Sequence, residues 1–87
     1  MSTNAQRSRL AKRCLDHFAF LTDIADDADC AITDLIANLG HYCIEHDLPF
    51  LSLIATAIGH WHVELTDPES VTLPRVSITI NESNDNA

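Results

Sequence analysis

The chain has 87 residues, 46% of them apolar, which suits one small domain with a hydrophobic core of its own. No apolar run approaches the roughly 18 residues of a membrane span, and no apolar segment follows the first charges as in a signal peptide. The formal net charge of −8 argues against direct DNA binding, and three cysteines without signs of secretion indicate reduced thiols in a cytoplasm.

The charges are distributed unevenly. Four of the five basic residues lie between residues 7 and 13, and the fifth is Arg75, whereas eleven acids and no Lys or Arg lie between residues 14 and 74. Such an acidic stretch repels nucleic acid and attracts a basic partner, although acidity also keeps a small domain soluble. The basic segment, RSRLAKR, could contact nucleic acid or pair with the acidic surface.

A first helix is predicted over residues 5–25. Its apolar side chains recur at helical spacing, at Leu10, Cys14, Phe18 and Leu21. Ser2 or Thr3 can cap its N-terminus. The following segment, DDADC at residues 26–30, supplies Asp side chains that can cap a second helix.

The second helix is predicted over residues 28–46 and has the clearest apolar face of the chain. That face consists of Ile32, Leu35, Ile36, Leu39, Tyr42 and Cys43. Pro49 disfavours helical geometry at Leu48, and Asp47 is a candidate N-cap for a third helix over residues 49–65. Gly59, inside the third helix, could mark the close approach of another helix.

Three helices with short breaks predict an all-α fold, an up-down-up three-helix bundle over residues 1–66. Residues 67–87 are predicted to form an extended tail, partly disordered at its polar end. Within it, VSITI at residues 76–80 alternates apolar and polar side chains, so the tail could form a strand. One strand cannot satisfy itself, so it would pair with a partner, lie across the bundle or stay disordered.

Two segments, CLDH at residues 14–17 and CIEH at residues 43–46, each place a cysteine and a histidine three residues apart. Together, Cys14, His17, Cys43 and His46 have the ligand types of a tetrahedral zinc site. Standard zinc modules pair their cysteines in a short loop, however, whereas these cysteines fall on two apolar helix faces. We therefore expect cysteines in the core, histidines at its edge, and no metal or cofactor.

No motif indicates catalysis. The chain lacks a Gly-rich phosphate loop and a serine nucleophile elbow, and Asp26, Asp27 and Asp29 lack the ligand spacing of a calcium loop. We expect a protein that is not an enzyme.

Residues 31–65 resemble small acidic proteins of uncharacterised function that bacterial phages, plasmids and integrated elements carry. These proteins share a DLIADL helix, the segment HYCDAHGLDF and a helix that ends near HYEAE. The matching residues are Asp34, Leu35, Ile36, Leu39, His41, Tyr42, Cys43, His46, Leu48, Phe50, His60, Trp61 and Glu64. The chain departs from the pattern at Asp47, where the family turns on glycine, at Pro49, and at Gly40, which interrupts a helix. The resemblance implies two helices, a turn and a mobile-element origin, but no activity.

Compact acidic proteins of mobile elements often bind a basic host protein, as anti-restriction and anti-CRISPR inhibitors do. The leading hypothesis is therefore a cytoplasmic protein of a bacterial host cell that mimics nucleic acid and inhibits a nucleic-acid-binding defence protein. The expected contact residues are Asp23, Asp26, Asp27, Asp29 and Asp34. The alternative is a self-associating structural or accessory protein, a homodimer through residues 76–80.

Overall fold

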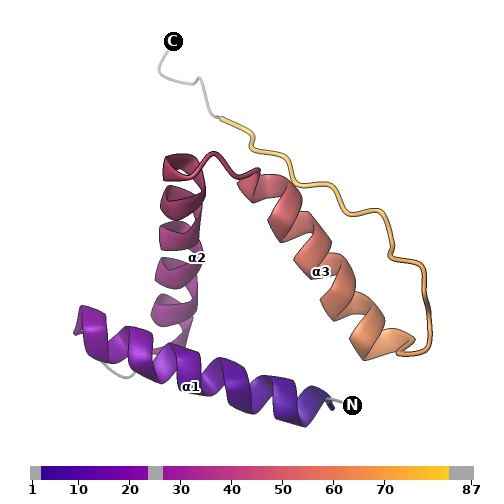
Figure 1. The fold of residues 1–87 in the computed structure, drawn as a ribbon, viewed down its shortest axis with the longest axis horizontal. Helices are drawn as coiled ribbons and strands as arrows, with labels where there is room; N and C mark the ends of the chain where they lie inside the picture. The colour runs from indigo at the N-terminus through magenta and orange to yellow at the C-terminus, as the bar shows by residue number, and fades with distance from the viewer. Residues whose placement is uncertain (1–2, 24–26, 83–87) are drawn as a thin grey trace. The chain divides into compact units, whose positions relative to one another are not determined.

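The computed structural model describes residues 3–23 and 27–82, and these residues form three helices and no strand (Figure 1). The helices are α1 at Asn4–Thr22, α2 at Ala28–Glu45 and α3 at Phe50–Thr66. The prediction of an all-α fold with three helices is confirmed. The chain divides into two compact units, Met1–Phe50 and Leu51–Ala87, so the boundary falls inside the predicted helical domain 1–66. We call them the N-terminal and the C-terminal unit.

Helix α1 begins with a capping box at Thr3, one of the two N-cap candidates of the sequence. The Thr3 hydroxyl accepts a hydrogen bond of 3.1 Å from the Gln6 amide, and the Thr3 amide donates one of 2.7 Å to the Gln6 side chain. These bonds satisfy amides that have no partner within the helix. The helix ends at Asp23, whose φ of 57° is left-handed and whose amide bonds to Ala19.

Helix α2 ends in a Schellman motif, which corrects the prediction for Asp47. The Leu48 amide bonds to the carbonyl of Cys43 at 2.8 Å, and the Asp47 amide bonds to the carbonyl of Ile44 at 3.4 Å. Asp47, with a φ of 59°, occupies the left-handed position of this motif and is not the N-cap of α3. Aspartate tolerates this conformation better than most residues, which explains how the chain turns without a glycine here.

The first turns of α2 lie across the middle of α1 (Figure 1). Within α2, Ala31 and Cys43 are the two buried side chains. The helix runs uninterrupted through Gly40, in agreement with the span predicted over residues 28–46. A Cβ at Gly40 would lie 3.0 Å from the Phe50 ring, so the glycine makes room for that ring.

In the C-terminal unit, residues 71–82 run as extended chain alongside α3 (Figure 1). Gly59 is buried beneath this tail: a Cβ there would lie 3.7 Å from the Pro74 carbonyl oxygen and 3.8 Å from the Leu73 Cβ. The close approach predicted at Gly59 is therefore made by the tail and not by a helix. Val76 and Ile78 are half-buried, whereas Ser77, Thr79 and Ile80 are exposed, and the described tail forms no strand, so the predicted strand stays a prediction.

Candidate acidic binding face

Three of the five predicted contact residues gather around one exposed cysteine at the start of α2. Asp27, Cys30 and Asp34 follow one another at helical spacing of three and four residues, so they lie on one side of the helix. Asp29 lies in the same first turn, about 100° around the helix axis from Cys30, and so borders this side. We call Asp27, Asp29, Cys30 and Asp34 the acidic face. Sequence reasoning missed Cys30 as its centre, although the spacing to its acidic neighbours was visible.

The other two predicted residues do not join this face. Asp23 ends α1, where its left-handed backbone gives it a structural role, although its side chain is exposed. Asp26 lies outside the described residues.

Asp27 is the N-cap of α2. Its carboxylate accepts hydrogen bonds from the Asp29 amide at 3.1 Å, the Cys30 amide at 3.3 Å and the Cys30 thiol at 3.4 Å. Chiefly because of the thiol and then the amide of Cys30, the pKa of Asp27 lies below its ordinary value of 3.8. The carboxylate therefore stays ionised at neutral pH while it caps the helix.

The thiol of Cys30 is held in its neutral form, chiefly by its hydrogen bond to Asp27. Its pKa is raised above the ordinary value of 9.0, first by the hydrogen bond to Asp27 and then by the charge of Asp27, by partial desolvation, and last by the charges of Asp34 and Asp29. A thiolate is the reactive form of cysteine, so this exposed thiol is held in its less reactive state.

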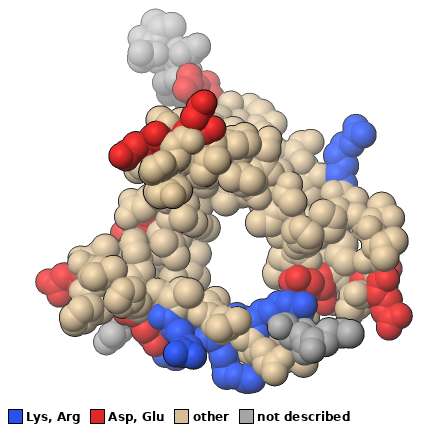
Figure 2. Space-filling view, in the orientation of Figure 1, with Lys and Arg blue, Asp and Glu red and all other residues tan. Residues whose placement is uncertain are grey.

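Asp29 and Asp34 are the acids of this face with free carboxylates. Both residues are exposed, and neither carboxylate bonds to another residue of 3–23 or 27–82. Helix α2 itself contains no Lys or Arg. Figure 2 shows the Lys and Arg side chains of the N-terminal unit gathered over α1. There Lys12 pairs with Asp16 at 2.7 Å, which matches one base of the predicted basic segment with an acid of its own helix.

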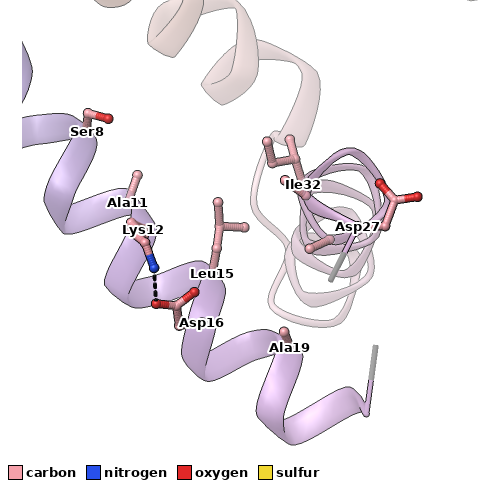
Figure 3. A pocket seen from close by; sticks show the side chains of 10 residues that line it. Ser8, Ala11, Lys12, Leu15, Asp16, Ala19, Asp27 and Ile32 are labelled. Carbon is pink, nitrogen blue, oxygen red and sulfur yellow. Dashed lines mark hydrogen bonds and ion pairs between the residues drawn. The ribbon is translucent and has the colours of Figure 1, made fainter. Parts of the chain in front are cut away.

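A groove of about 610 Å³ opens between α1 and α2 (Figure 3). It is lined by Ser8, Ala11, Lys12, Leu15, Asp16, Ala19, Asp27, Ala28, Ala31 and Ile32. Leu15 and Ile32 point into the space between the helices, where the small residues around them leave room for an apolar side chain. Each charged residue in the lining already bonds to another group, Lys12 to Asp16 and Asp27 to the first turn of α2. The groove thus suits contact with an apolar side chain better than proton transfer.

The two Cys–His segments occupy different environments. Cys43 is buried, as expected, whereas Cys14 is exposed, contrary to the prediction of a core position. His46 ends α2, and its ring lies 4.2 Å from the ring of Tyr42. Across residues 3–23 and 27–82, no three His, Cys, Asp or Glu side chains come together as a metal ion would require. The structure therefore does not assemble the zinc ligands that the spacing suggested.

No protein-family model, curated protein or solved structure matches this chain. Among the helices of the described residues, none is long and apolar enough to cross a membrane.

Proposed function

We propose that this chain acts by binding a basic protein through the acidic face at the start of α2, and not by catalysis. The observation that carries the proposal is the cluster itself: Asp27, Asp29 and Asp34 lie within four residues of the exposed Cys30, two of them with free carboxylates, on a helix without Lys or Arg. Carboxylates of one sign steer a basic partner during its approach and can pair with its Lys or Arg side chains on contact.

The partner that we propose is a nucleic-acid-handling protein of a bacterial host. A chain of net charge −8 that resembles small proteins of bacterial mobile elements would meet nucleic-acid-handling proteins of its host cytoplasm. Inhibition of a host defence protein, of the anti-restriction or anti-CRISPR type, would follow from occupying that protein's nucleic-acid site. The net charge and the resemblance support this form of the proposal.

The charge spacing along α2 favours a local contact over imitation of a nucleic-acid backbone. No charged residue lies between Asp34 and Glu45, a distance of about 16 Å along a helix axis, at 1.5 Å per residue. Double-stranded DNA presents one negative charge per roughly 1.7 Å of its axis. We therefore expect the partner to recognise a compact acidic cluster, with salt dependence that reflects only a few charge pairs.

A salt-gradient pull-down tests the proposal. The immobilised chain is exposed to bacterial lysate, and bound proteins are released by rising salt. The double variant Asp29→Asn/Asp34→Asn should release a basic protein at lower salt than the wild type. The control Asp67→Asn/Glu69→Gln removes the same two charges from exposed positions outside the face and should leave the elution unchanged. Equal elution of both variants, or binding that does not respond to salt, contradicts the proposal.

The up-down-up bundle stays a proposal that the short breaks between the helices support. Trp61, the single tryptophan, is 60% exposed, and its fluorescence can show whether other helices cover α3. If a bundle covers the apolar side of α3, the emission of Trp61 should be blue-shifted and poorly quenched by acrylamide. Emission like that of tryptophan in water would speak against it.

One observation favours the alternative, a self-associating accessory protein. The main-chain N–H and C=O groups of residues 73–82 bond to no other described residue. An extended segment with unpaired main-chain groups is a ready template for a strand from another chain.

A further inference from the structure

We infer that residues 76–80 form a two-stranded antiparallel ribbon with the same residues of a second copy, with Ile78 at the two-fold axis. This inference deepens the self-associating alternative and is independent of the acidic face, so either can fail without the other.

The segment at residues 76–80 has the composition of a β-strand, although it pairs with no strand among the described residues. Val76, Ile78, Thr79 and Ile80 are β-branched, and residues 76–81 contain no charge, glycine or proline. Pro74 and Arg75 precede it and Glu82 follows it, and such residues limit strand pairing to what lies between them.

The side chains already alternate as a strand requires. Val76 and Ile78 are half-buried in the C-terminal unit, where the tail runs alongside α3, and Ser77 and Thr79 face solvent. Ile80 belongs to the apolar side but remains 69% exposed. Its exposure leaves an apolar side chain that a second copy can cover.

The apolar side fixes the register. In an antiparallel ribbon, residue i of one copy lies opposite residue j of the other, and the sum i + j is the same for every pair. Val76, Ile78 and Ile80 of both copies lie on one face only if this sum is even, because a slip of one residue moves the side chains of one strand to the other face. The sum that also leaves Pro74 and Glu82 at the ends is 156. It pairs Val76 with Ile80, Ser77 with Thr79 and Ile78 with itself.

Each of these pairs is favourable across strands. Val76 of one copy covers the exposed Ile80 of the other on the side of the ribbon that bears both α3 helices, and the Ser77–Thr79 pair can exchange hydroxyl hydrogen bonds on the opposite side. An isolated two-stranded ribbon is marginal in water, but packing of one face against helices stabilises it. A second copy is therefore the occupant that matches the segment at every position.

Sedimentation equilibrium of the purified chain tests the pairing. The wild type should approach twice the 9.6 kDa mass of one chain as its concentration rises to about 200 μM. Ile80→Lys should raise the dissociation constant at least about tenfold, because it places a charge opposite Val76. The control Val71→Lys changes a side chain that is 99% exposed and lies outside the ribbon, and it should dimerise as the wild type does.

Two further measurements fix the mode of association. In a sample of mixed labelled and unlabelled chains, NMR should show contacts between the methyl groups of Val76 in one copy and Ile80 in the other. Alternate amides of residues 76–80 should exchange slowly with solvent. A monomeric wild type, or a dimer that Ile80→Lys leaves intact, would overturn the inference.

Discussion

Both units of the chain cover a helical glycine with a bulky group, and they differ in how tightly that group fits. In the N-terminal unit the Phe50 ring lies 3.0 Å from the position of a Cβ at Gly40, closer than ordinary van der Waals contact. In the C-terminal unit the tail lies 3.7 Å from the Cβ position at Gly59, which is ordinary contact. Packing therefore leaves little room for a side chain at position 40, whereas a methyl group fits at position 59.

The largest expected effect comes from removing the ring. Phe50→Ala should lower the free energy of unfolding by about 2 kcal/mol, less than for a fully buried ring because Phe50 is half-buried. Urea denaturation followed by circular dichroism measures the change. An effect below about 0.5 kcal/mol would mean that the ring contributes little to the N-terminal unit.

The effect of Gly40→Ala should depend on whether the Phe50 ring is present. We expect destabilisation of about 1 kcal/mol with Phe50 present, since the added methyl group meets the ring. In the Phe50→Ala background the same change should stabilise by about 0.5–1 kcal/mol through helix propensity. The same sign in both backgrounds would refute the close fit.

Gly59→Ala is the matched change in the C-terminal unit. It should stabilise α3 by about 0.5–1 kcal/mol, because alanine favours the helix and its methyl group finds room beneath the tail. The urea midpoint should rise. A fall would show that the tail packs more tightly on α3 than the distances indicate.

Asp47→Gly tests the turn after α2. Glycine relieves the left-handed backbone at this position but costs more entropy on folding, so we expect a net stabilisation of about 0.5 kcal/mol. Asp47→Ala should destabilise instead, because alanine tolerates the left-handed region poorly.

The smallest expected effect is a pH dependence at the start of α2. The pKa of Asp27 is lower in the folded chain than its ordinary 3.8, so its stabilising contribution is complete above about pH 3.8 and is lost as pH falls through the folded value. Asp27→Asn keeps a capping residue but should remove this acid dependence. The same variant should speed alkylation of Cys30 at pH 8, measured by peptide mass spectrometry, because it removes the main cause of the raised thiol pKa. Unchanged alkylation would contradict the thiol–carboxylate contact.

Local features of the fold could be predicted from the sequence, whereas contacts between residues far apart along the helices could not. Helix spans and the caps at Thr3 and Asp27 follow from periodicity and from side chains that bond to nearby amides. Asp47 was misassigned because aspartate suits both an N-cap and a left-handed helix end, and residue type alone does not separate them. The contact of Phe50 with Gly40 depends on the direction of the turn between α2 and α3, which no spacing encodes.

The same limit holds for the candidate site. Helical spacing is enough to place Asp27 and Asp34 on one side of α2, whereas Asp23 lies outside that helix, so its position relative to α2 could not be read from spacing. Cys14 shares an apolar stripe in the sequence, yet it is exposed.

The most direct test of the acidic face uses the two exposed cysteines. Cys43 is buried, so a benzophenone maleimide can be attached to Cys30 alone in a Cys14→Ser variant, or to Cys14 alone in a Cys30→Ser variant. After irradiation in bacterial lysate, the label at Cys30 should form an adduct with one basic protein, at a yield that falls with salt, and the label at Cys14 should not. Equal adducts from both positions, or none from Cys30, would contradict binding through the acidic face.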